Sequence, residues 1–341
     1  MKSALFPRAR YLVGKWCREL LGMTTISEIN LELVNYCNLG CKWCALDHTI
    51  PKVTMGQDLL RKLLEDLVTD RRFRNVRKLN LYSGGGEPLL HRDLAGVLRT
   101  IKEYKARCKA RRAAFPTVHV VTNATVLNER VATTILESGA VDEIRFSIDG
   151  GTREAFEELR SGAHWDAVAG YIKRFAELNA GRIRTGIICV LEPGKPLTTD
   201  WMSDEFKDVV AQVDEIELRH PHDFRGDVIV QGRTKRFLDH CYFLFHLLVL
   251  LPDGGVVVCC VDSNGVGLIG NLWESGLYEI YNSPKRRAMV WNLITGRRDR
   301  NELCKNCSGY APGEDEVGIE SLKGGGPPVR GRVPLDRVAG M

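Results

Sequence analysis

Residues 37–44 read CNLGCKWC, so three cysteines fall within eight residues, directly after the apolar segment Ile29–Val34. Gly40 permits a tight loop here, on which three thiolates can face one point. Three cysteines can hold a cubane iron–sulfur cluster and leave one iron open to another ligand. A structural zinc site is the alternative, with His48 as the fourth ligand, because structural zinc is usually bound by four side chains.

Apolar segments rich in Val and Ile alternate with amphipathic segments from about residue 28 to residue 220. The predicted strands are Ile29–Val34, Lys78–Tyr82, Val118–Thr122, Glu143–Ile148, Thr185–Leu191 and Glu215–Arg219. The predicted helices between them are Leu59–Val68, Leu94–Lys105, Glu129–Glu137, Trp165–Leu178 and Glu205–Val213. Strict alternation indicates parallel βα units. Six such units predict an α/β fold, a partial (β/α)6 TIM-type barrel, and periodicity leaves a doubly wound sheet open as the alternative.

The composition is that of a globular protein with a sizeable core, at 44% hydrophobic and 27% charged residues. A net charge of +5 is too small to indicate nucleic acid as a partner. The longest apolar segment, Phe243–Leu251, is well short of the ~18 residues that a membrane span needs. The basic, amphipathic N-terminus has no signal-peptide core, so we expect a cytoplasmic location. Thiols stay reduced there, so metal or redox chemistry best explains the eleven cysteines.

Four short motifs follow the predicted strands in order. They are the cysteine motif, Ser83-Gly84-Gly85-Gly86-Glu87-Pro88, Thr122-Asn123-Ala124 and Ser147-Ile148-Asp149-Gly150. Because each lies at the carboxyl end of a strand, the motifs meet at the edge where barrel enzymes place their active sites. This ordered set, over roughly residues 29–190, resembles the radical S-adenosylmethionine (SAM) superfamily.

The resemblance implies a set of cofactor contacts. A [4Fe–4S] cluster would be bound by Cys37, Cys41 and Cys44, and SAM would chelate its fourth iron. The residues implied to contact SAM are Trp43, Gly84, Gly85, Gly86, Glu87, Asn123, Ser147 and Arg160. The glycines would let the backbone approach the SAM ammonium, and the Arg160 guanidinium suits the SAM carboxylate. The chain departs from the family at Ala124, where glycine is common, and in the fifth strand, which lacks the full GxIxGxxE pattern.

A second group of cysteines lies after residue 220. Cys241, Cys259, Cys304 and Cys307 are separated by 17, 44 and two residues. With Asp253-Gly254 and Gly270-Asn271-Leu272 around the second cysteine, this pattern resembles the SPASM/twitch domain that follows the barrel in many radical SAM enzymes. The resemblance implies that these four cysteines bind one auxiliary [4Fe–4S] cluster, with a zinc ribbon as the alternative.

Cys260 stands beside Cys259, and either cysteine of the pair could be the ligand. The spacing from Gly254 favours Cys259, which leaves Cys260 as a second thiol next to the cluster. The predicted organisation is an N-terminal extension over 1–27, a barrel over 28–219, a SPASM/twitch domain over 220–310 and a flexible tail over 311–341.

The resemblance also implies radical chemistry. After reduction by a flavodoxin or ferredoxin-type donor, the first cluster would cleave SAM to a 5′-deoxyadenosyl radical that abstracts hydrogen from the substrate. A thiol donor at Cys260 favours epimerisation. The alternatives are a dehydrogenase that oxidises an alcohol through the auxiliary cluster, and a decarboxylase of a uronic acid.

The substrate class is inferred from what the chain lacks. Only 36 residues precede Cys37, and no second auxiliary-cluster motif follows Cys307. Many peptide-modifying relatives have a peptide-recognition domain before the first cluster motif and a second auxiliary cluster after it. A single auxiliary cluster resembles enzymes of antibiotic biosynthesis that act on sugars and aminocyclitols. We therefore expect a small carbohydrate-type substrate, such as a sugar, aminoglycoside or nucleoside intermediate, with neither nucleic acid nor membrane. A peptide-modifying maturase is the alternative. The histidines of Arg219–Arg225 are predicted to face the active-site mouth.

Overall fold

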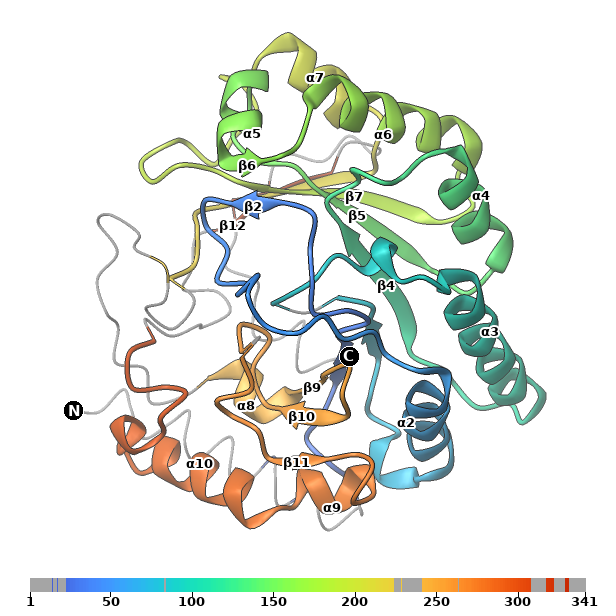
Figure 1. The fold of residues 1–341 in the computed structure, drawn as a ribbon, viewed down its shortest axis with the longest axis vertical. Helices are drawn as coiled ribbons and strands as arrows, with labels where there is room; N and C mark the ends of the chain where they lie inside the picture. Colours follow the sequence, from blue (N-terminus) through green and yellow to red (C-terminus); the bar gives the residue numbers. More distant parts are fainter. Residues whose placement is uncertain are drawn as a thin grey trace.

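The computed structural model describes residues 23–82, 84–223, 228, 241–262 and 264–307, the isolated residues 14 and 17, and the backbone of 317–321 and 329–330. Within this part of the chain, the strands form one large sheet in the order β11-β10-β9-β1-β3-β4-β5-β7-β8-β12-β13. Figure 1 shows the sheet curving around an interior, with helices along its outer side. None of the described helices has the length and apolar character that crossing a bilayer requires.

Six strands of this sheet match the six that the sequence predicts. They are β1 (Glu28–Leu31), β3 (Lys78–Asn80), β4 (Thr117–Thr122), β5 (Glu143–Ser147), β7 (Arg184–Val190) and β8 (Glu215–Arg219). Each pairs in parallel with the next in chain order. Because the order never reverses, the sheet has no switch point of the doubly wound type, and the partial-barrel prediction is confirmed.

The predicted helices are present with bounds close to those expected. They are α2 (Gln57–Thr69), α3 (Leu94–Ala110), α4 (Glu129–Ser138), α6 (Trp165–Asn179) and α7 (Asp204–Val210). Side-chain caps explain where several begin, since Asp93, Asn128 and Ser203 each accept a hydrogen bond from a first-turn N–H. The sequence did not predict η1 (Arg71–Phe73), η2 (Pro88–Leu90), α5 (Arg153–Leu159) or the two-residue strands β2 (Gly40–Cys41) and β6 (Arg160–Ser161).

The C-terminal region adds a seventh parallel strand to the barrel. Strand β9 (Leu247–Leu250) pairs with β1, and the antiparallel strands β10 (Gly255–Val257) and β11 (Gly270–Asn271) continue the sheet. All four β9 residues are buried, which is typical of parallel strands covered on both faces. Around these strands lie α8 (Tyr242–His246), α9 (Leu277–Tyr281), α10 (Pro284–Ile294) and η4 (Arg298–Arg300).

The domain boundaries stay predictions. Most of the expected N-terminal extension and C-terminal tail lies outside the described residues. Within the tail, the structure describes β12 (Val317–Ser321) and β13 (Val329–Arg330), and β12 pairs antiparallel with β8.

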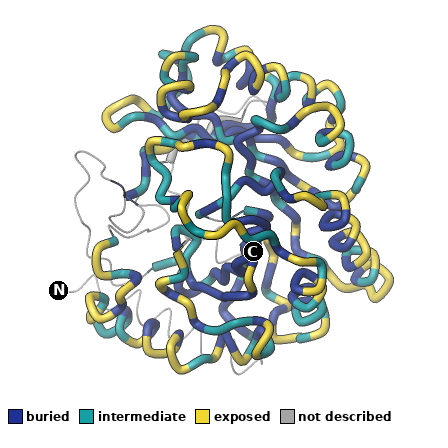
Figure 2. Tube along the Cα trace, viewed as in Figure 1, coloured by how far each residue is buried: buried dark blue, intermediate teal, exposed yellow. Residues whose placement is uncertain are grey.

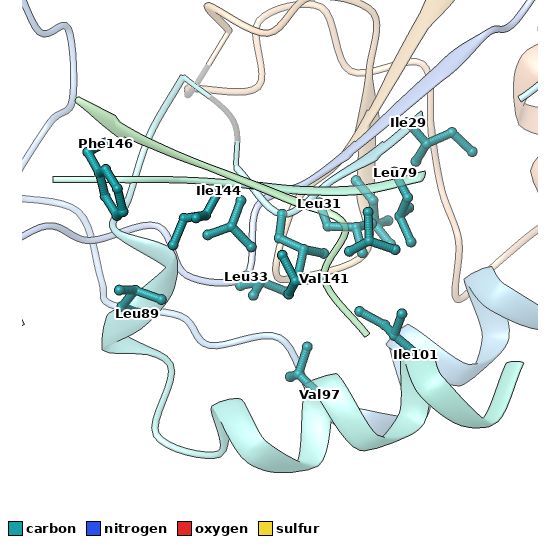
Figure 3. Close-up of a cluster of buried hydrophobic side chains, with 14 of the residues drawn as sticks. Ile29, Leu31, Leu33, Leu79, Leu89, Val97, Ile101, Val141, Ile144 and Phe146 are labelled. Carbon is teal, nitrogen blue, oxygen red and sulfur yellow. The ribbon is translucent and has the colours of Figure 1, made fainter. Parts of the chain in front are cut away.

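The core lies between the sheet and the outer helices. Alternate strand residues face it, so Ile144 and Phe146 of β5 are buried, and Phe146 packs edge-to-face on Phe175 of α6 with ring centroids 5.5 Å apart. Figure 3 shows Val97 and Ile101 of α3 below the apolar residues of the strands. Figure 2 shows the consequence: the strands are mostly buried and the outer helix faces exposed.

The intervening residues of β5 and β8 face the barrel interior, and most of them are charged. Arg145 donates hydrogen bonds to Glu143 at 2.5 Å, to Glu217 at 2.9 Å and to Glu215. Burial opposes ionisation of Glu143, but its hydrogen bond with His119 and the Arg145 charge lower its pKa to about 2. Three carboxylates are therefore held around one guanidinium in the interior of the barrel.

Removing that guanidinium should destabilise the fold. Arg145→Met leaves three partly buried carboxylates without their shared partner, so we expect a loss of about 3–5 kcal/mol in the free energy of unfolding. Urea unfolding at neutral pH measures this. Arg174→Met is the matched control, because Arg174 pairs with exposed glutamates and its loss should change the stability far less.

The loss in Arg145→Met should shrink as the pH falls. Without Arg145 the crowded carboxylates acquire raised pKa values in the folded state, which then binds more protons than the unfolded chain. A deficit that is equal at all pH values, or equal in the two variants, would contradict this account of the interior.

Candidate active site

The loop between β1 and α2 carries Cys37, Cys41 and Cys44 over the carboxyl ends of the parallel strands (Figure 1). Within it, β2 pairs antiparallel with β6, which places Cys41 opposite Arg160. The Lys42 N–H also donates to the Leu159 carbonyl at 2.8 Å. Because β6 follows α5 on another part of the barrel, these backbone bonds fasten the loop across the strand ends.

Cys37 and Cys41 hold their protons in the absence of metal. Burial raises the pKa of Cys37, and burial raises the pKa of Cys41 to about 12 against the opposing charge of Arg160. The charges of Cys44 and Cys37 raise the Cys41 pKa further. A metal therefore has to displace protons as it binds. Three neighbouring thiols beside a guanidinium fit a three-cysteine cluster, whereas His48 is exposed.

The glycine motif passes through a space that side chains would fill. A Cβ on Gly86, where φ is +76°, would lie 1.8 Å from the Val34 carbonyl oxygen. A Cβ on Gly84 would lie 2.1 Å from the Cys260 carbonyl oxygen. The motif is thus wedged between the end of β1 and the second cysteine region, and only glycine fits at these positions.

Glu87 anchors this motif from inside the protein. Its carboxylate is buried and accepts hydrogen bonds from the Leu89 N–H at 3.0 Å, the Thr122 hydroxyl at 2.7 Å and the Asn123 N–H at 2.8 Å. Its own N–H donates to the Tyr36 carbonyl. The Glu87 carboxylate therefore ties the loop after β3 to the end of β4, and its backbone N–H ties them to the loop after β1. Its predicted contact with SAM stays a prediction.

Arg160 is buried next to the end of β5. Its Nε donates to Asp149 Oδ2 at 2.8 Å, and its Nη2 donates to the Ser147 hydroxyl. Asp149 Oδ1 in turn accepts from the Val190 N–H at 2.8 Å. The structure thus brings the predicted SAM residues Ser147 and Arg160 together. It adds Asp149, which the sequence placed only in a turn motif, as the group that orients the guanidinium.

Asn123 and Trp43 complete the predicted SAM residues. Asn123 Nδ2 lies 3.5 Å from Cys37 Sγ and 3.1 Å from Asn38 Oδ1, so this amide supports the cysteine loop directly. The next residue, Ala124, has a φ of +60°, a left-handed conformation that explains why glycine suits this position. Trp43 is half-exposed, and the Lys42 ammonium lies 5.6 Å from its ring centre.

The second cysteine group surrounds a single cavity. Cys241, Cys259, Cys304 and Cys307 all line it, together with apolar side chains such as Leu244 and Leu303. Burial raises the pKa of Cys241 to about 12, and the Cys259 and Cys307 charges add to the effect. Four thiols from three separate segments fit one auxiliary cluster.

Arg298 holds the last of these segments in place. Its Nε donates to the Cys304 carbonyl at 3.0 Å and its Nη2 donates to the Cys307 carbonyl. The guanidinium charge also opposes the burial that raises the pKa of Cys304. Arg298 therefore fixes the backbone of the C-x2-C turn and favours its thiolates, a role that the sequence did not reveal.

The adjacent residues Cys259 and Cys260 lie in different surroundings. Cys259 lines the cavity, whereas Cys260 packs against the interior apolar cluster formed by Leu247, Val249, Leu251 and Val257. The hydrogen bond between the two thiols raises the pKa of Cys259, and burial adds to it. This arrangement favours Cys259 as the ligand and places Cys260 between the auxiliary cavity and the glycine motif.

The histidines after β8 lie elsewhere than expected. His220 is half-buried and bonds the Lys195 carbonyl at 3.0 Å. His222 lines the cavity of the four cysteines. The prediction that both face the active-site mouth is therefore wrong for His222, and Phe224 and Arg225 lie outside the described residues.

Comparison with protein families identifies the two regions. Residues 31–197 match the radical SAM superfamily, and residues 241–308 match SPASM, an iron–sulfur cluster-binding domain. The chain belongs to the radical SAM superfamily. As a radical SAM protein with a SPASM domain, it binds SAM at a [4Fe–4S] cluster and holds auxiliary iron–sulfur.

Two curated relatives differ in how much of their length this radical SAM chain spans. An S-adenosyl-L-methionine-dependent 2-deoxy-scyllo-inosamine dehydrogenase from Niallia circulans is 22% identical over 293 residues, which cover 85% of this chain and 96% of the relative. A GTP 3′,8-cyclase from Limosilactobacillus fermentum is 25% identical over 162 residues, 48% of this chain and 45% of the cyclase. The chain thus spans less than half of the cyclase.

Solved structures share the fold. BtrN in complex with AdoMet and 2-DOIA superposes with a TM-score of 0.57 at 20% identity, over 83% of this chain and 92% of BtrN. Streptococcus suis SuiB bound to its precursor peptide SuiA superposes with a TM-score of 0.61 at 14% identity, over 89% of this chain and 75% of SuiB. At these identities the likeness establishes the fold alone.

Asp149 offers a test of the SAM-binding geometry in this radical SAM protein. Asp149→Asn keeps the shape of the side chain but leaves one oxygen to accept two donors, so Arg160 loses its orientation. We expect SAM affinity to fall about 10-fold, as one buried charged hydrogen bond implies, measured by calorimetry on the reconstituted protein. Asp166→Asn, which removes an exposed partner of Arg153, is the control and should bind SAM normally. Unchanged affinity in both variants would contradict the role of Asp149.

Proposed function

We propose that this chain abstracts hydrogen from a hydroxyl-bearing carbon of a sugar or aminocyclitol and that the product is the ketone. The Niallia circulans relative, named as a dehydrogenase of an aminocyclitol, supports this because the match spans almost its whole length. The single observation that carries the substrate class is the charged lining of the barrel interior. Hydroxyl and amino groups find hydrogen-bond partners there that an apolar substrate would leave unsatisfied.

The lining extends to the height of the predicted SAM site. Ser147, Ile188 and Glu217 stand opposite one another on adjacent strands. With neighbouring strands about 4.8 Å apart, the row spans roughly 10 Å between Ser147 and Glu217. Burial raises the pKa of Tyr82, and the charges of Cys260 and Glu217 add to the effect, so its hydroxyl remains a hydrogen-bond donor in the same interior. Ser147, Glu217 and Tyr82 thus offer polar contacts to a small polar ring.

Oxidation of an alcohol to a ketone removes one hydrogen atom, one proton and one electron. When bound, the SAM cluster with SAM supplies the radical that takes the hydrogen atom, and the auxiliary cluster supplies an electron acceptor. The protein has to orient the carbinol and take up its proton. Glu217 suits this task, because Arg145 holds its Oε2 at 2.9 Å while the carboxylate faces the interior. We therefore assign Glu217 as the base.

Epimerisation is the second candidate because of the position of Cys260. Its backbone touches the glycine motif at Gly84, and its side chain packs on the interior apolar cluster. A thiol in this position can return a hydrogen atom to a substrate radical from a side other than that of SAM. The conversion of the substrate is then redox-neutral, while SAM is consumed with one electron from the flavodoxin or ferredoxin-type donor. The Cys260 sulfur radical must afterwards regain one proton and a second electron from the same donor.

The test uses the anaerobically reconstituted protein with SAM, dithionite and a panel of aminocyclitols and sugars that includes 2-deoxy-scyllo-inosamine. We expect 5′-deoxyadenosine that carries deuterium from the labelled carbinol carbon, and one ketone per 5′-deoxyadenosine. Glu217→Gln should slow ketone formation about 100-fold, as loss of a general base does, with unchanged SAM affinity. Turnover of peptides and of no carbohydrate would contradict the proposal.

The same reactions separate the two outcomes. In deuterated water an epimerase product carries one solvent deuterium at the inverted centre, and a ketone does not. Cys260→Ala should leave 5′-deoxyadenosine formation intact in both cases but abolish product only if Cys260 is the hydrogen donor. Cys108→Ala, which alters a buried thiol of α3, is the control.

A further inference from the structure

His222 belongs to the surroundings of the auxiliary cysteines. It follows β8 on the connection to the SPASM region and lines the cavity that Cys241, Cys259, Cys304 and Cys307 surround. One ligand atom each from His222, Asp223 and Cys307 lie within 4.8 Å of one another. An imidazole thus stands at a site whose other polar groups are thiols.

Neighbouring side chains hold both His222 and Cys307 in position. His222 Nδ1 lies 3.3 Å from Asp223 Oδ1, and both side chains are mostly buried. Carboxylates that contact a histidine in this way fix the orientation of the ring at metal sites. On the other side, Arg298 binds the carbonyls of Cys304 and Cys307. The distance between the imidazole and Cys307 is therefore set from both sides.

The cavity around the His222 imidazole is largely apolar, which strengthens any hydrogen bond that the imidazole makes there. Phe243, Leu244, Val258 and Leu303 make up much of the lining. Hydrogen bonds to the sulfurs of an iron–sulfur cluster withdraw electron density and raise its reduction potential, and such bonds act more strongly where water is excluded. His220, two residues earlier, is half-buried and bonds the Lys195 backbone carbonyl instead.

We propose that His222 donates a hydrogen bond to the sulfur of Cys307 and so raises the reduction potential of the auxiliary cluster. This rests on the proposed assignment of the four cysteines as cluster ligands. A higher potential favours electron uptake by the auxiliary site, which the oxidation of a substrate radical requires. His222 is a positioning and tuning residue here, with no contact to substrate.

The test measures the potential of the auxiliary cluster alone. In a Cys37→Ala/Cys41→Ala/Cys44→Ala background, electron paramagnetic resonance follows a redox titration of the remaining cluster. His222→Phe keeps a ring of similar size without a donor and should shift the potential to more negative values. His222→Gln keeps an N–H donor, so its potential should lie between those of His222→Phe and the unchanged histidine. His220→Phe should leave the potential unchanged.

Two results would overturn the proposal. An unchanged potential in His222→Phe, with the iron content retained, would show that the imidazole makes no such bond. Strong nitrogen hyperfine coupling in the wild-type background, with iron lost from both His222 variants, would make His222 a direct ligand instead. Neither readout involves substrate, so failure of the proposed carbohydrate chemistry would leave this test unaffected.

Discussion

The parallel pairing of β9 with β1 is the constraint on which both cysteine sites depend. Strand β1 leads into the loop of Cys37, Cys41 and Cys44, while β9 and β10 lead to Cys259 and Cys260. The four backbone register pairs between β1 and β9 therefore set the two sites relative to each other. The contact between Gly84 and the Cys260 carbonyl is a direct result. One sheet, rather than a linker, relates the SAM motifs to the auxiliary cysteines.

Local anchors then fix the side chains at the strand ends. Glu87 joins the loops after β3 and β4 through its carboxylate and the loop after β1 through its backbone N–H, and Asp149 turns Arg160 toward Ser147. Both anchors are buried acids bound by donors, so their energy comes from hydrogen bonds that water cannot replace. The thiols beside them keep raised pKa values. Cluster assembly is thus coupled to proton release in a frame that the protein has already built.

The six barrel strands and their helices were predictable because packing against the helices places an apolar residue at every second position of strands such as Glu143–Ile148. The site motifs were predictable for a related reason, since parallel strands bring their carboxyl ends to one edge. Strand β9 was not assigned, although it lies within the apolar segment Phe243–Leu251. Its partner β1 is more than 200 residues earlier, and periodicity carries no information on such pairings.

The roles of Asp149, Arg298 and His222 were hidden for a different reason. Asp149 and Arg298, and His222 in its proposed role, act through contacts made in three dimensions, from a turn, a short helix and a connection whose sequences show no periodic pattern. The assignment of Cys259 over Cys260 lies between these cases. The spacing from Gly254 favoured it, and the cavity now supports it.

Iron and sulfide content after anaerobic reconstitution tests the central claim, that one chain holds two separate clusters on two cysteine sets. The wild type should bind about eight irons, as two cubane clusters require. Replacement by alanine of Cys37, Cys41 and Cys44, or of Cys241, Cys259, Cys304 and Cys307, should leave about four in each case, and Cys260→Ala should leave about eight. A wild type with about four irons that falls to none in the first variant would contradict the account, because the C-terminal cysteines would then hold no iron.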